Sequence, residues 1–238
     1  MHQKDPMRTG RSRPSSKALA GQSLPEFLIV VPVFLFLLLL IFQLVLIYRA
    51  KTTLDYAALE AARTGAVTGA RVNEMNKGLA RGLTPLYATE SGVSGLAEAY
   101  AKARADLLIN SRISIISPSQ QAWDDFAEQQ YNGQRALPSD NLAFRDRGIK
   151  ASGVNVQDAN ILKIRVQYDY PLIVPFVDLV LRGDSEFVKS DGFWDSANVD
   201  MKLPILSGPV MGNYYRIPLE SYAIVRMQSP IYSNADLP

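Results

Sequence analysis

The sequence predicts an α+β protein in which a long N-terminal transmembrane helix continues into a domain with further helices and a C-terminal antiparallel sheet. Three observations predict this class. An uncharged apolar run covers residues 27–48, and helical spacing of apolar residues then dominates to about residue 107. Strict alternation of apolar and polar residues is clearest only later, from residue 161. Helices first and strands afterwards are typical of an α+β domain with an antiparallel sheet.

The apolar run from Phe27 to Tyr48 predicts a membrane-spanning helix. It has 22 residues, none of them charged, and only Pro32 and Gln43 interrupt its apolar character. A helix needs about 20 such residues to cross the hydrocarbon core of a bilayer, so this run is long enough. A secretory signal peptide is the rival interpretation, but its apolar region would be about 7–15 residues long.

Residues 1–21 form a polar, basic leader. Five basic residues stand there against Asp5 alone, although the whole chain has a net charge of only +2. The rest of the chain is therefore slightly acidic and shows no electrostatic footprint for nucleic acid. Positive charge before a membrane span favours a cytoplasmic N-terminus, so the domain that follows is expected to cross the membrane.

The N-terminal helix is predicted over residues 22–66, of which about 27–48 span the membrane. Ser23 with Glu26 three residues later fits a capping box, and Pro25 is tolerated in a first turn. Pro32 lies inside the helix and is expected to bend it or to remove one hydrogen bond. Beyond the span, small residues continue the helical pattern as a stripe.

The remaining residues, 67–238, are predicted to form the extracytoplasmic α+β domain. Helices are predicted over residues 71–83, stopped by Pro85, and then over 96–107 and 120–130. Strands are predicted over residues 111–116, 161–170, 199–205 and 217–227, and a long loop over 131–160. The apolar segment 172–181 is too short to span a membrane. It is either a buried crossover on the sheet or a patch for a partner or a membrane surface.

Catalytic residues are scarce in this chain. Its one histidine, His2, lies in the leader and it has no cysteine, so the domain holds no Ser-His or Cys-His pair and no usual zinc site. It also lacks a glycine-rich phosphate loop. No enzyme, cofactor or metal site is therefore expected. Glu26, at the lip of the span, is the better functional candidate, because a carboxylate there is costly; helix capping alone is the simpler interpretation.

Family resemblance becomes visible at the start of the helix. Gly21, four further residues, Glu26-Phe27 and the apolar run resemble the type IVb prepilin processing motif. More narrowly, the chain resembles the TadE-like minor pseudopilins of the Tad (tight adherence) pilus system. The stretch from Ala57 to Gly65 is similar to the alanine/arginine-rich segment of that family, and residues 159–168 and 221–227 resemble it too.

The resemblance implies cleavage after Gly21 by a membrane prepilin peptidase, with Gln22 as the new N-terminus. Glu26, with Phe27 beside it, would pair with a free N-terminal amine during assembly. Pro25, directly before Glu26, departs from the usual motif.

The same resemblance implies a pilin-like structural subunit in the bacterial inner membrane, used to assemble or initiate an adhesive pilus. Its partners would be the peptidase, other Tad pilins and pseudopilins, the inner-membrane assembly platform and membrane lipid. The alternative is an uncleaved, single-pass anchored binding or scaffold protein in the periplasm.

Overall fold

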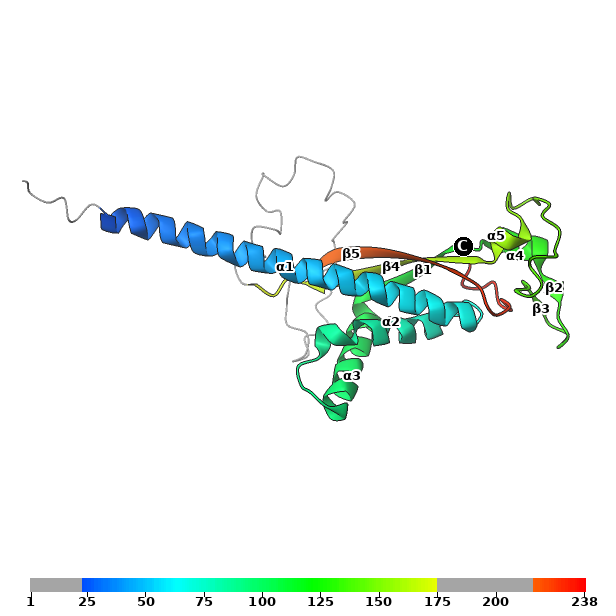
Figure 1. Ribbon diagram of the computed structural model, residues 1–238, viewed down its shortest axis with the longest axis horizontal. Helices are drawn as coiled ribbons and strands as arrows, with labels where there is room; N and C mark the ends of the chain where they lie inside the picture. Colours follow the sequence, from blue (N-terminus) through cyan, green and yellow to red (C-terminus); the bar gives the residue numbers. More distant parts are fainter. Residues whose placement is uncertain (1–22, 175–215) are drawn as a thin grey trace, which may run out of the picture. The chain divides into compact units, whose positions relative to one another are not determined.

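The structure, a computed structural model, describes residues 23–174 and 216–238 (Figure 1). In chain order its elements are α1 (Ser23–Val67), α2 (Val72–Tyr87), α3 (Val93–Asn110), β1 (Ser111–Ser117), α4 (Gln120–Phe126), β2 (Glu128–Gln129), β3 (Arg135–Ala136), α5 (Val156–Ala159), β4 (Ile161–Pro171) and β5 (Arg216–Arg226). A long apolar helix, further helices and a C-terminal antiparallel sheet confirm the predicted fold class. The chain falls into two compact units divided between Leu38 and Leu39. The second unit, Leu39–Pro238, contains the sheet and the packed core.

The larger sheet has three antiparallel strands in the order β1-β4-β5. On the central strand, Ile164 lies opposite Ile115 of β1 and opposite Ala223 of β5. Alternate side chains of β4 are buried, namely Leu162, Ile164, Val166, Tyr168 and Tyr170. The period of two read from residues 161–170 is therefore confirmed, since successive side chains of a strand point to opposite faces.

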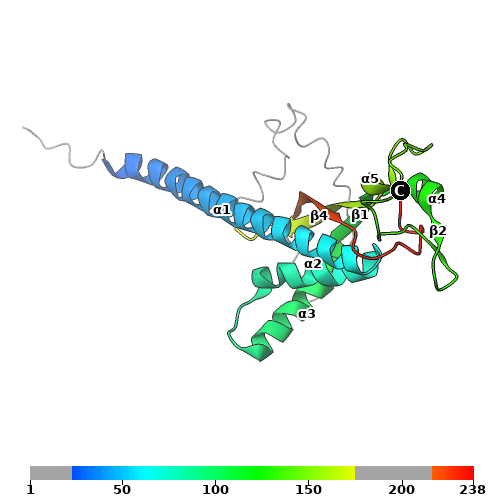
Figure 2. The ribbon, with the colours of Figure 1, turned by 45° about the vertical axis from the view of Figure 1, so that its right-hand side comes forward.

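The core lies where this buried face of the sheet meets the second half of α1 and helix α2. All three contribute to one cluster of buried apolar residues, among them Leu54 of α1, Leu79 of α2 and Ile164 of β4. Figures 1 and 2 both show the second half of α1 beside the sheet. The helices α2 and α3 lie on the side of α1 that faces away from β5. The C-terminal segment is bonded to the end of α1. Both the backbone N–H and the hydroxyl of Ser229 donate to the carbonyl of Ala66, at 3.0 Å each.

Two predicted helix ends are wrong. Pro85 does not stop α2, which includes it and ends only at Tyr87. A proline costs a helix one N–H bond, and the buried side chains of Leu83 and Thr84 hold this turn to the core. The helix predicted over 120–130 ends at Phe126, and the chain then forms the short strand β2.

The segment 131–160 is mostly irregular, as predicted, but it contains β3 and the single turn α5. Asn155 starts this turn, because its side chain accepts a hydrogen bond from the backbone N–H of Asp158 at 2.8 Å. That is the usual role of asparagine at a helix N-cap. The strand predicted over 199–205 lies outside the described residues, and so does 175–181 of the apolar segment.

Candidate functional site

The predicted processing residues stand at the border of the described chain. Gly21 and Gln22 lie outside the described residues. Ser23 and Pro25 belong to the first turn of α1, which begins at Ser23. The predicted helix therefore starts where the capping-box pattern places it, while the capping roles of these two residues stay predictions.

Glu26 is the acidic residue of the first turn of α1, and its side chain is exposed. Phe27, beside it, is 64% exposed. A carboxylate in the first turn interacts favourably with the positive end of the helix dipole. Since it is also open to its surroundings, Glu26 is able to pair with a cation that comes from outside this helix.

The next stretch of α1 is apolar and exposed. Among the described residues, α1 is the one helix with the length and composition to cross a membrane. It continues as helix on both sides of Pro32. More than half of the surface is exposed for most large side chains between residues 27 and 48, such as Phe34, Ile41, Phe42 and Val45. An apolar surface of this extent marks a membrane or protein contact, so α1 fits a single-pass membrane anchor.

The second half of α1 presents small residues to helix α2. A Cβ atom built on Gly82 of α2 would lie 2.4 Å from Ala57 Cα. One built on Gly78 would lie 2.6 Å from Thr64 Oγ1 and 3.1 Å from Ala61 Cα. The two glycines are four residues apart, so they share one face of α2. The alanine-rich stretch is therefore the surface on which α2 packs at close range, and the Gly-x-x-x-Gly spacing was the signal for it in the sequence.

A buried polar cluster joins α2, α3, β4 and β5. Asp106 of α3 accepts hydrogen bonds at one carboxylate oxygen from the hydroxyls of Tyr87, at 2.5 Å, and Tyr168, at 2.9 Å. Its other oxygen accepts from Asn110 Nδ2, at 2.7 Å, and from Arg216 Nη2, at 2.9 Å. Asp106 is only 6% exposed. The cluster therefore fastens the α2–α3 pair to the sheet.

The two tyrosines of this cluster keep their protons. Burial, and then the negative charge of Asp106, raise the pKa of Tyr168. Burial is also the largest cause that raises the pKa of Tyr87, followed by its neighbours Tyr168 and Asp106. Both phenols therefore act as hydrogen-bond donors to the carboxylate throughout the physiological pH range.

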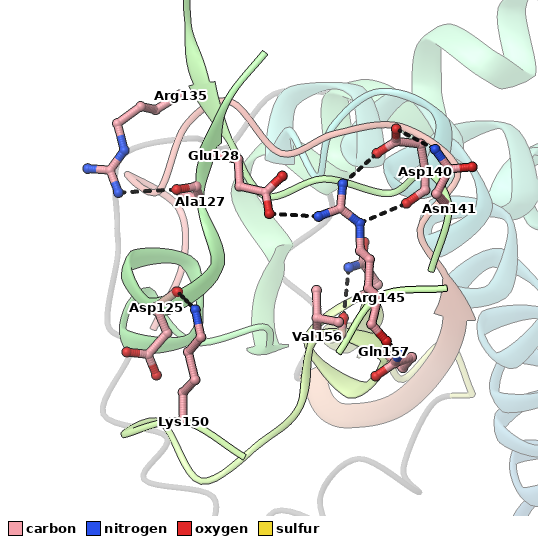
Figure 3. A network of polar contacts seen from close by, with 11 residues as sticks. Asp125, Ala127, Glu128, Arg135, Asp140, Asn141, Arg145, Lys150, Val156 and Gln157 are labelled. Carbon is pink, nitrogen blue, oxygen red and sulfur yellow. Dashed lines mark hydrogen bonds and ion pairs between the residues drawn. The ribbon is translucent and has the colours of Figure 1, made fainter. Parts of the chain in front are cut away.

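A second polar network holds the loops between α4 and β4 (Figure 3). Arg145 donates to Glu128 Oε1 at 2.7 Å and to Asp140 Oδ1 at 3.1 Å. The hydrogen bond and charge of Glu128 raise the pKa of Arg145. Gln157 donates to the backbone carbonyls of Leu142, at 2.8 Å, and of Arg145, at 3.2 Å. These contacts give a defined conformation to loops that have few regular elements.

The described residues offer little for catalysis. No group of three or more His, Cys, Asp and Glu side chains among them could hold a metal ion. A hollow of about 630 Å³ lies beside the loops, with Arg147 and Arg226 at its edge and Leu142 and Met227 among its apolar lining. The residues that line it include no acidic or histidine side chain. The hollow therefore offers no carboxylate or imidazole, the groups that most often act as general acid or base.

The comparison with protein families bears on the N-terminal helix. Residues 21–63 match the model of the family described as TadE-like protein. No curated protein and no solved structure matches the chain significantly. The matched segment holds Gly21, Glu26, the exposed half of α1 and most of the small residues that face α2. The match supports a pilin-like role associated with the Tad pilus. The resemblance noted from the sequence is thus confirmed at the N-terminal helix, where residues 21–63 are similar to TadE-like proteins.

Proposed function

We propose that the protein is a minor, pilin-like subunit that helps to assemble or initiate a Tad-type adhesive pilus. The observation that carries this proposal is Glu26, an exposed carboxylate on the first turn of a helix whose following residues are uncharged and exposed. A carboxylate at the lip of a membrane is costly when alone and tolerated when a cation pairs with it. A free N-terminal amine, its own or that of a neighbouring subunit, is such a cation.

Cleavage after Gly21 would create that amine at Gln22. Gln22 and Glu26 are four positions apart, which is about one turn of helix. Cleavage would also discard the basic leader, residues 1–21, and free the helix over 22–66 for lateral movement into a pilus. The leader's charge supports a cytoplasmic N-terminus in the inner membrane and a periplasmic domain over 67–238.

The size of that domain favours a minor, tip or initiating position over a repeating one. In this proposal the partners are the prepilin peptidase, other Tad pilins and pseudopilins, and the inner-membrane assembly platform. The first acts on Gly21 and Gln22, while the others contact the exposed half of α1.

Mass spectrometry of the membrane-extracted protein tests the cleavage. With the peptidase present, the proposal expects an N-terminus at Gln22. Gly21→Val should block processing, because the peptidase needs a small residue there. Gly10→Val, a matched change in the same leader but outside the motif, should mature normally. Normal maturation of Gly21→Val would show that the site is wrong.

Glu26→Ala tests the pairing role separately from the cleavage. We expect processing to remain largely intact and incorporation into pili to fall. Glu90→Ala, which removes an exposed carboxylate from the loop between α2 and α3, is the control and should assemble as the unchanged protein does. Equal pilus assembly by Glu26→Ala would rule out the pairing role.

The alternative function is an uncleaved, single-pass anchored scaffold or binding protein. Its distinguishing result is an intact leader, beginning at Met1, in cells that process other prepilins. The exposed apolar half of α1 fits this alternative equally well, so the N-terminus decides between the two.

A further inference from the structure

Gln43 is fully buried although its neighbours along α1 are exposed. Its Oε1 atom accepts a hydrogen bond of 2.9 Å from the backbone N–H of Val174, three residues beyond the end of β4. Phe42 is 56% exposed, Leu44 52% and Val45 57%. At this level, therefore, one side of α1 is covered by the chain that leaves β4, and the other side is bare and apolar.

β4 and its continuation run back along α1 toward this level. Near one end of the strand, a Cβ atom on Gly65 would lie 3.0 Å from Leu162 Cδ2. At the other end Val174 contacts Gln43. The helical residues from Gln43 to Gly65 rise about 33 Å, and an extended chain from Leu162 to Val174 covers about 40 Å. The two lengths agree, so the strand follows the helix in the antiparallel direction, as Figure 1 shows.

The position of Gln43 sets the depth of this contact. It lies five residues before Tyr48, about 7.5 Å along the helix from the end of the uncharged run. It lies inside the span predicted over residues 27–48, among exposed apolar side chains such as Phe42 and Leu44, so this level is expected to lie within the bilayer. Non-helical backbone at such depth is tolerated only where it is buried against protein. The hydrogen bond from Val174 to Gln43 and the burial of Leu172, which is 2% exposed, meet that condition.

We propose that residues 171–174 lie in the interfacial layer of the bilayer that α1 spans, on the side of the folded domain. In this arrangement Ile173, which is 51% exposed, faces the boundary between lipid headgroups and acyl chains. Gln43 fastens the segment to α1. The segment is uncharged and apolar, and its hydrogen bond to Gln43 holds it against the helix. The domain therefore touches the membrane through this second contact as well as through its anchor.

Depth-dependent fluorescence quenching tests this contact in the full chain. The protein has no cysteine, so a single introduced cysteine carries the dye at one place. Ile173→Cys and Ile224→Cys are a matched pair, because both positions are exposed isoleucines, at 51% and 59%, outside the anchor. Ile224 lies opposite Lys163, at the other end of β4. Each variant is labelled with a polarity-sensitive dye and inserted into phosphatidylethanolamine/phosphatidylglycerol vesicles that contain spin-labelled lipids.

We expect lipids labelled near the headgroup to quench the dye at position 173 several-fold more than the dye at position 224. Phe34→Cys, in the middle of the anchor, should respond to deeply labelled lipids and confirms insertion. Equal, weak quenching at 173 and 224 in vesicles where position 34 is quenched would overturn the proposal. Ile173→Trp, measured as the difference from the unchanged protein with its two native tryptophans, repeats the measurement without a dye and so detects a perturbation by the label.

Gln43→Leu tests the fastening role. Leucine has a similar size to glutamine and suits the apolar surroundings, but it removes the acceptor for the Val174 N–H. Quenching at position 173 should fall in this variant, whereas Leu44→Ile, on the exposed side, should leave it unchanged. Undiminished quenching in Gln43→Leu would show that Gln43 does not hold the segment. None of these measurements requires cleavage or pilus assembly, so their outcome is independent of the proposed function.

Discussion

The two halves of α1 have the same backbone conformation and opposite surfaces. From Phe27 to Tyr48 the side chains are large, apolar and mostly exposed, whereas from Ala50 to Ala66 those that face the domain are buried and, apart from Leu54, small. What covers each half explains the difference. Lipid adapts to the shape of any apolar side chain, but a protein core is packed as densely as an organic crystal. The first half therefore needs only apolar character, and the second needs particular sizes.

Four changes test how far this contrast holds. They are ordered from the largest expected effect to the smallest, and the first three act on the packed domain.

Asp106→Ala should destabilise the domain most. It leaves Arg216 and two tyrosine hydroxyls without their acceptor, and breaking a buried charge pair by removing one partner costs about 3–5 kcal/mol. Chemical denaturation of the detergent-solubilised full chain measures the loss. Asp124→Ala, at an exposed position of α4, should change the free energy of unfolding by less than about 0.5 kcal/mol. Similar effects of the two substitutions would refute a structural role for the cluster.

Gly82→Val should cost about 3 kcal/mol, because its side chain would overlap Ala57 and push α2 away from α1. Gly82→Ala should also destabilise the domain, but by a smaller amount. Asn73→Val places the same branched side chain on an exposed position of α2 and controls for helix propensity. A thermal midpoint of Gly82→Val equal to that of Asn73→Val would mean that the close approach of the two helices is wrong.

Alkaline pH should weaken the domain through Tyr87 and Tyr168. Folding raises the pKa of both phenols, so above about pH 10 the unfolded chain loses protons that the folded chain keeps. The stabilisation is present below that pH and is lost as the pH rises, by up to about 1.4 kcal/mol per pH unit for each tyrosine. Unfolding free energies at pH 9–11 check this slope. Tyr168→Phe should remove the contribution of that tyrosine to the slope. An unchanged slope would contradict the role given to Tyr168.

Phe34→Leu should have the smallest effect, below about 0.5 kcal/mol, because the side chain is 60% exposed and does not belong to the packed core of the described residues. The thermal midpoint of the domain and the yield of membrane-inserted protein are the measurements. A marked loss in either would show that this half of α1 also depends on side-chain shape.

Local patterns in the sequence were sufficient for much of the fold. The uncharged run predicted the anchor, and the strict alternation from Leu162 to Tyr170 predicted the central strand, because both signals depend only on neighbouring residues. The resemblance to TadE-like proteins followed mainly from the N-terminal helix, and the family match covers residues 21–63 of it. The likeness noted at residues 159–168 and 221–227 lies outside that match. The roles of Gly21, Gln22 and Glu26 remain predictions, since cleavage and assembly are events that involve other molecules.

Only the tertiary structure decided which residues depend on distant partners. Pro85 remains in its helix because the surrounding turn is held to the core. Gly82 requires small neighbours because another helix crosses at that point. Asp106 and Gln43 are ordinary polar residues in the sequence, and their burial follows from elements up to 131 positions away. The sequence thus determined which segment is long and apolar enough to span a membrane and how the elements alternate, since these properties are local. Close packing and the pairing of buried polar groups depend on the folded arrangement of the whole domain, so the sequence by itself left them undecided.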